Sequence, residues 1–224
     1  LEFRRVLFRS FEKEPFFEVA AHEIRMLPKL EGTVHVNMAL IVKFMQNYFF
    51  NPAEFPEVPR RDDMADDTFL FDQGPTSGLG KVQFHDYNLA YDSVDLPNVN
   101  MMKEQIKAFK RFLVKATPDK NQSRDIDYLL AVGDVFTLVA YGQLIIESSR
   151  IFNIENDLLD EIFDFMVRDF SKFALALYSK PSNSEAQKEH CLAMIKSPVA
   201  NEARFLSIWE NKVYTLKGQY QMND

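Results

Sequence analysis

The sequence contains little cysteine and little glycine. Cys191 is the single cysteine in 224 residues, so no disulfide can form within the chain. A lone cysteine fits a reducing compartment, and we expect a protein that is not secreted: cytoplasmic in a bacterium, mitochondrial in a eukaryote. The glycine count of 7, together with long segments of helical periodicity, favours helices.

Basic residues are also in deficit. The chain has 26 Lys and Arg against 33 Asp and Glu, which gives a net charge of −7. An acidic chain repels phosphates, so nucleic-acid binding is not expected, and a general attraction to anionic membranes is disfavoured. We also expect no bilayer-spanning helix, because the most apolar stretch, 34–50, is interrupted by polar residues. The four histidines lack the paired spacing of metal ligands.

Hydrophobic residues, in contrast, are plentiful. They make up 46% of the chain and include 21 Phe, which is enough to form a substantial core. Residues 1–10 are set apart, because LEFRRVLFRS resembles the translation of a sequencing adapter. We interpret these ten residues as an artefact and the remaining chain as a C-terminal fragment of a longer protein.

Periodic apolar residues predict helices along most of the chain, in three parts. Residues 11–50 contain two helices, at about 13–27 and 34–50, on either side of a tight corner. Residues 51–100 form a linker or irregular segment, with a short strand over KVQFHDY at 81–87. Residues 101–224 form a helical bundle, with helices from residue 101 and over about 123–149, 155–178, 184–195 and 198–216, the last with Pro198 in its first turn. The predicted fold class is all-α.

The corner Glu31-Gly32-Thr33 carries the candidate chemistry. Glu31 lies among apolar residues at 27, 30, 34 and 36, and loss of water in such surroundings raises the pKa of a carboxyl group. A raised pKa suits a general base that must remove a weakly acidic proton. Gly32 allows the close approach of a ligand, and Thr33 is predicted to cap the following helix.

The segment RMLPKLEGTVHVN, from Arg25 to Asn37, resembles the closing helix pair of the acyl-CoA dehydrogenase family. There a Glu-Gly-Thr turn joins the last two helices of the C-terminal four-helix domain. The resemblance implies that Glu31 is the catalytic base, which removes the α-proton of an acyl-CoA while the β-hydrogen leaves as hydride to FAD. It also implies that Gly32 and Thr33 bind FAD, and His35 with them, although many members have Gln or Glu at that position.

Long members of this family carry an additional helical domain after the corner, and the chain after Glu31 is similar to that architecture. The resemblance then implies an oxidoreductase of fatty acid β-oxidation, with an acyl-CoA substrate, an electron acceptor such as an electron-transfer flavoprotein, and a homo-oligomeric assembly. Two alternatives remain open: an acyl-CoA oxidase that passes electrons to oxygen, and a non-enzymatic helical interaction module. A membrane contact of the helical extension also remains open.

Three other features are interpreted as structural. The Met and Phe stripes of the C-terminal helices, which begin at Met101 and Met102, are typical of core packing rather than of an acyl channel. His190 and Cys191 point about 100° apart on a helix, so Cys191 is expected to be a packed residue. The basic residues at 103, 107, 110 and 111 are expected to form a solvated helix face.

Overall fold

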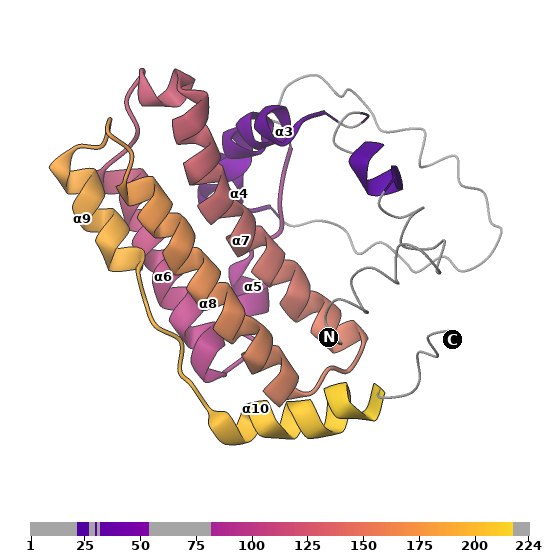
Figure 1. Cartoon of the computed structure of the whole chain (residues 1–224). Helices are drawn as coiled ribbons and strands as arrows, with labels where there is room; N and C mark the ends of the chain where they lie inside the picture. Colours follow the sequence, from indigo (N-terminus) through magenta and orange to yellow (C-terminus); the bar gives the residue numbers. More distant parts are fainter. Residues whose placement is uncertain (1–21, 27–29, 31, 54–81, 217–224) are drawn as a thin grey trace, which may run out of the picture.

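The computed structural model describes residues 22–26, 30, 32–53 and 82–216. These residues are mostly helical and contain no strand, which confirms the all-α fold class (Figure 1). The elements are α3 (Val34–Ile41), η1 (Val42–Phe44), α4 (Met45–Phe50), α5 (Asn88–Tyr91), α6 (Pro97–Lys115), η4 (Gln122–Arg124), α7 (Ile126–Ile151), α8 (Asn156–Tyr178), α9 (Glu185–Met194), α10 (Glu202–Ile208), the π-helix η5 (Trp209–Val213) and η6 (Tyr214–Leu216).

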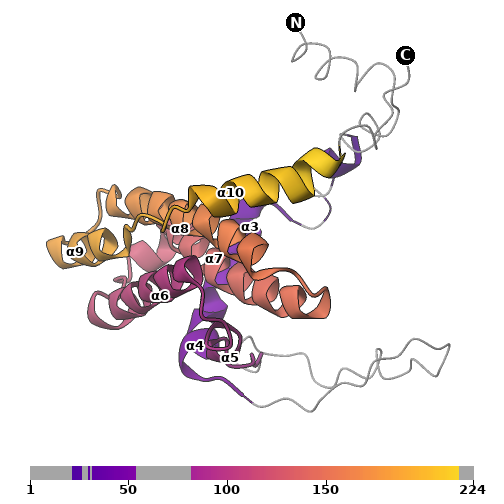
Figure 2. The same ribbon diagram turned by 90° about the horizontal axis from the view of Figure 1, so that it is seen from below.

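Four helices, α6 to α9, form a bundle. Helix α8 contacts α6, α7 and α9, and α6 also contacts α9, while α10 crosses the bundle at its lower end (Figures 1 and 2). The apolar positions of α6 recur every three or four residues, and this periodicity turns one face of the helix into the core. The buried residues on that face include Val99, Met102, Ile106, Phe109 and Phe112.

Helix α7 is the longest of the described helices and is strongly apolar. Residues Ile126–Ile151 are long and apolar enough to cross a membrane by length and composition, so the prediction that no segment reaches this limit is wrong. In the structure, half of its most apolar stretch is buried by other elements. Contacts with α3, α5, α8 and η4 cover several sides of the helix, and apolar residues are favoured on those sides.

The segment Val34–Phe50 shares its core with the C-terminal helices. Tyr48 and Phe49 are buried against Phe136, and Phe49 also packs edge-on against Phe109 of α6. The Tyr48 hydroxyl donates a hydrogen bond of 2.7 Å to Gln143 Oε1 of α7. Residues before the predicted linker at 51–100 thus pack in one core with residues after it, and the linker includes the internal stretch 54–81, which lies outside the described residues.

Two sequence predictions for residues 81–100 are wrong. Residues 82–86 form no strand; one backbone hydrogen bond, from Ala53 N to Phe84 O, ties them to the α4 end, and the Phe84 ring packs between Phe44 and Tyr48. Helix α6 begins at Pro97 rather than at residue 101. Its first turn is fixed because the Asn98 backbone N–H donates to Asp160 Oδ1 of α8 at 2.8 Å.

The start of the last helix also differs from the prediction. Pro198 precedes it, and α10 begins at Glu202 with Asn201 as N-cap, whose side chain accepts from the Arg204 N–H. The Asn98 side chain holds this stretch outside a helix. Its Oδ1 accepts from Val199 N at 2.7 Å and its Nδ2 donates to Val199 O at 3.2 Å. Because the backbone N–H and C=O of Val199 both bond to Asn98, they do not form the hydrogen bonds of a helix.

Candidate functional site

The predicted corner lies at the N-terminus of α3. Glu31 falls outside the described residues, whereas Gly32, Thr33 and His35 lie within them. Thr33 is the N-cap of α3, and its hydroxyl accepts from the Val36 N–H at 3.4 Å, which confirms the predicted cap. The first intrahelical bond runs from Asn37 N to Thr33 O at 3.0 Å. The backbone amides of Val34 and His35 therefore come before the hydrogen-bonded part of the helix.

Gly32 turns the chain into α3 with a left-handed backbone. Its φ is +88°, a conformation that L-residues with a Cβ rarely adopt. The Asn37 side chain closes over it, since Asn37 Nδ2 donates to Gly32 O at 3.4 Å. A Cβ added at Gly32 would lie 3.2 Å from Asn37 Oδ1. Backbone geometry and local crowding thus both favour glycine at this position.

The apolar neighbourhood of the corner is exposed to solvent. Leu30, Val34 and Val36 are 71%, 59% and 63% exposed, and Thr33 and His35 are also exposed. The expected desolvation of a carboxylate among these residues is therefore not supplied by the described part of the chain. The reason is that α3 turns its buried side toward α7 and its other side chains away from the bundle.

A second feature is an apolar groove of about 310 Å³ between the end of α7 and the start of α8. It is lined by Tyr141, Leu144, Ile145, Ser148, Ser149, Phe152, Ile154, Leu159 and Ile162. The Asn153 backbone, with φ of +52°, makes the turn between the two helices next to it. The core residues considered for an acyl channel do not line this groove: Met102, Phe163 and Phe170 are fully buried in the bundle, as expected for core packing.

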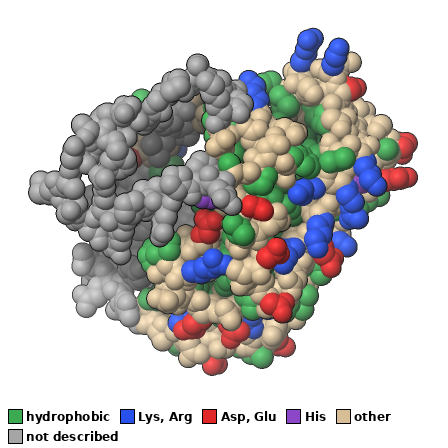
Figure 3. Space-filling view, turned by 180° about the vertical axis from the view of Figure 1, so that it is seen from behind, with side chains coloured by type: hydrophobic (Ala, Val, Ile, Leu, Met, Phe, Trp, Pro, Cys, Tyr) green, Lys and Arg blue, Asp and Glu red, His purple; other side chains and the backbone are tan. Residues whose placement is uncertain are grey.

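No metal centre is found among the residues that the structure describes, because no group of three His, Cys, Asp or Glu side chains comes together there. The basic residues of α6 take part in ordinary surface contacts. Lys103 forms an ion pair of 2.7 Å with Asp92, and Lys110 lies over the rings of Phe50 and Tyr87. On the face seen in Figure 3, Lys and Arg are interspersed with Asp and Glu.

Cys191 is a packed residue of α9, as expected from the sequence. It is fully buried in α9, and burial raises the pKa of its thiol to about 12. Because the thiolate is the reactive form, the native thiol is expected to resist Ellman's reagent at pH 8 and to react at once after unfolding in guanidinium chloride. Absorbance at 412 nm measures both reactions. Rapid labelling of the folded protein would contradict this placement.

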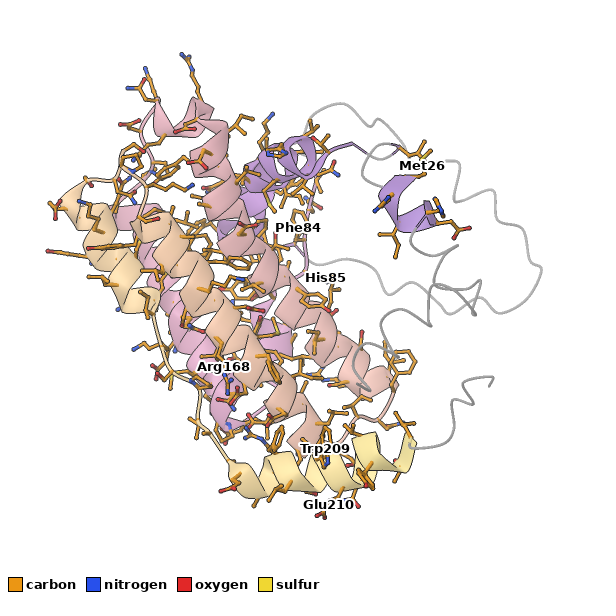
Figure 4. All side chains as sticks on the ribbon, in the orientation of Figure 1. Met26, Phe84, His85, Arg168, Trp209 and Glu210 are labelled. Atoms are coloured by element: carbon orange, nitrogen blue, oxygen red, sulfur yellow. The ribbon has the colours of Figure 1, made fainter. Side chains whose placement is uncertain are left out.

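A buried ion-pair cluster, which the sequence reasoning missed, fastens α10 to α8. The Arg204 guanidinium contacts Asp160 and donates to Glu161 Oε2 at 2.8 Å, with Asp164 at 3.9 Å. Arg168, one turn further along α8, pairs with Asp164 at 2.5 Å. Figure 4 places Arg168 on α8 and Trp209 on the helix that crosses near the start of α8. The Asp164–Arg168 spacing was visible in the sequence, but the long-range partner Arg204 was not.

The described architecture is that of an all-α protein. It has a helical bundle, α6 to α9, and the helical segment Val34–Phe50, which follows the Gly32 corner and packs against α7. Comparisons with models of protein families, with curated proteins and with solved structures found no match to this chain.

Proposed function

We propose that the chain is the C-terminal part of an FAD-dependent acyl-CoA dehydrogenase, in which Glu31 is the catalytic base. The observation that carries the proposal is the corner itself. A glycine in the left-handed conformation is followed by a threonine that caps a helix, in the order Glu-Gly-Thr that the family uses. This geometry leaves Thr33 exposed beside Gly32, which is partly exposed with Asn37 over its Cβ side.

The described residues fit a contact with FAD in two respects. Gly32 is partly exposed, although Asn37 lies over its Cβ side, so a flat ring or a ribityl chain can approach its backbone from the other side. Thr33 and His35 are exposed, and the free first amides of α3 can donate to oxygen atoms of a ligand. FAD, when bound, accepts the β-hydrogen of the substrate as hydride. Gly32, Thr33 and His35 would hold the cofactor from the α3 side.

Glu31 would remove the α-proton, and its backbone N–H would donate to the thioester carbonyl. Such a donor stabilises the negative charge that develops on that oxygen, which acidifies the α-proton. A carboxylate suited to this task needs dry surroundings. The exposed Leu30, Val34 and Val36 would supply them once further protein covers this side of α3. That requirement supports a longer parent chain rather than activity of these residues alone.

The proposal includes the partners of the family: an acyl-CoA substrate, an acceptor such as an electron-transfer flavoprotein, and a homo-oligomer. The proposed location is the cytoplasm of a bacterium or the mitochondrion of a eukaryote. An acyl-CoA oxidase would use the same base and cofactor, and oxygen uptake without an added acceptor would reveal it. The exposed apolar side of α3 also favours a helical interaction module, which would bind no flavin.

The test uses the complete parent protein, expressed from its full gene. Anaerobic addition of acyl-CoAs of increasing length is expected to bleach the flavin of the wild type. Glu31→Gln is expected to slow the bleaching by roughly 10²–10⁴-fold while the protein stays folded and yellow, because removal of a general base costs about that factor. The matched control is Glu23→Gln, the same substitution at an exposed position eight residues earlier. A colourless parent protein, or equal rates in both variants, would reject the proposal.

A further inference from the structure

Helix α3 buries little of its surface, although Ile41 at its end packs against the core and the chain continues directly into η1 and α4. Among its eight described residues, Met38 is the one that is buried, with 9% of its surface exposed. Its neighbours Val36 and Leu40 are exposed. The partner of α3 is α7, and the two helices lie against each other in Figure 1. At the end of α3 that carries the corner, Met38 is therefore the main contact with α7, while Ile41, η1 and α4 anchor the other end.

A gap in the surface of α7 at Gly133, here named the Gly133 notch, receives Met38. A Cβ built on Gly133 would lie 2.4 Å from both Met38 Cγ and Met38 Sδ, and 3.2 Å from Val42 Cγ2. Carbon atoms in ordinary contact lie roughly 3.5–4 Å apart, so a methyl group at this position would force the Met38 side chain out of its place on α7. One turn further on, the Thr137 hydroxyl lies 3.6 Å from Met38 Sδ. Glycine is unfavourable in the interior of a helix. Close packing against Met38 therefore explains Gly133 in α7 better than helix propensity does.

We infer that the Gly133 notch is a positioning device for the corner: by seating Met38 it fixes where Gly32 and Thr33 face. This inference rests on the function proposed above. The link between notch and corner is short and stiff, because Asn37 precedes Met38 and bonds to both Thr33 O and Gly32 O. Gly133 touches no substrate and acts through Met38. On this inference, α7 is part of the framework that positions the site.

The test compares two variants that each add one methyl group to a buried glycine of α7. Gly133→Ala collides with Met38 of α3. Gly142→Ala collides with Tyr91, whose hydroxyl would lie 2.2 Å from the new Cβ and donates to Val139 O at 2.9 Å. Both variants are expected to lose stability from overpacking. Only the first disturbs the helix that carries the corner.

In the complete parent protein, Gly133→Ala is expected to slow flavin reduction at saturating acyl-CoA roughly 10–100-fold, since a displacement of about 1 Å can cost that much. The acyl-CoA concentration at half-saturation is expected to stay nearly constant, and Gly142→Ala is expected to keep the wild-type rate. Met38→Ala removes both atoms that the new methyl meets, so adding it to Gly133→Ala is expected to recover part of the rate. Amide hydrogen exchange in 37–41 is expected to accelerate in Gly133→Ala only.

The outcomes separate the inference from the proposed function. If acyl-CoA reduces the wild-type flavin but Gly133→Ala and Gly142→Ala have the same rate, the inference fails and the function stands. Unchanged hydrogen exchange in Gly133→Ala, or no recovery in the double variant, would also overturn it. If acyl-CoA does not reduce the wild-type flavin at all, the function itself fails, and the positioning role falls with it.

Discussion

Arg204→Ala is expected to lower the free energy of unfolding by about 3–5 kcal/mol, the loss found when one partner of a buried ion pair is removed. Arg204 is buried, and its guanidinium faces the buried carboxylates of Asp160 and Asp164. Its Nε donates to Glu161, which is partly buried. Without Arg204, these carboxylates keep their desolvation but lose their main cation. The effect is therefore large even though an intact buried pair is itself of modest net value.

The matched control is Arg168→Ala. Arg168 pairs with the same Asp164 at 2.5 Å, but its side chain is mostly exposed, and solvent-exposed pairs contribute about 0–1 kcal/mol. Urea unfolding followed by far-UV circular dichroism measures both changes. Trp209, the single tryptophan, lies one and a half turns after Arg204 and reports by fluorescence on the same helical segment. A loss below about 1 kcal/mol for Arg204→Ala, equal to that of the control, would show that the cluster does not hold α10.

Phe109→Ala is expected to cost about 3–5 kcal/mol, the usual range for truncation of a buried phenylalanine. Phe109 is fully buried in α6. Its ring contacts Phe49 of α4, Phe112 of its own helix and Phe170 of α8, at centroid distances of 5.8, 6.2 and 6.4 Å. The truncation leaves a cavity where α4, α6 and α8 meet, and none of these rings can fill it without moving the others.

The same unfolding measurement provides the control, Phe165→Ala. Phe165 is 57% exposed on α8 and lies under the Arg168 guanidinium, so its loss is expected to cost less than about 1 kcal/mol. Because Phe49 belongs to the segment before residue 54, Phe109→Ala should destabilise that segment and the bundle together. Separate transitions, with α3 and α4 unaffected, would contradict a shared core.

Local sequence patterns predicted the long helices well, because their apolar residues recur with helical spacing over several turns. The predicted helix at 155–178 corresponds to α8 at Asn156–Tyr178, and the predicted cap at Thr33 is present. The errors arise where a residue distant in the sequence determines the local backbone structure. Asn98 holds Val199 in an extended segment and delays the start of α10, and no pattern within 195–201 could have indicated that contact.

In the candidate site too, features set by neighbouring residues could be predicted, whereas features set by distant elements could not. The left-handed turn at Gly32 follows from residues within the corner and was predictable in kind. Burial of the corner was expected from its apolar composition, but Leu30, Val34 and Val36 are exposed, because burial depends on which other elements pack there. The apolar stretch of α7 was missed because the prediction rested on 34–50 as the most apolar part of the chain, whereas Ile126–Ile151 is long and apolar enough to cross a membrane by length and composition.

The contact between α3 and α7 has a consequence for biosynthesis. Met38 and Thr137, which meet in the folded chain, are 99 residues apart in sequence. At roughly 5–20 residues per second, a ribosome needs roughly 5–20 s to extend the chain from one to the other. During that interval Met38, Tyr48 and Phe49 have no α7 to pack against. The nascent segment is therefore a natural client for chaperones that bind exposed apolar helices, and slowed translation between these two points would lengthen its exposure to aggregation.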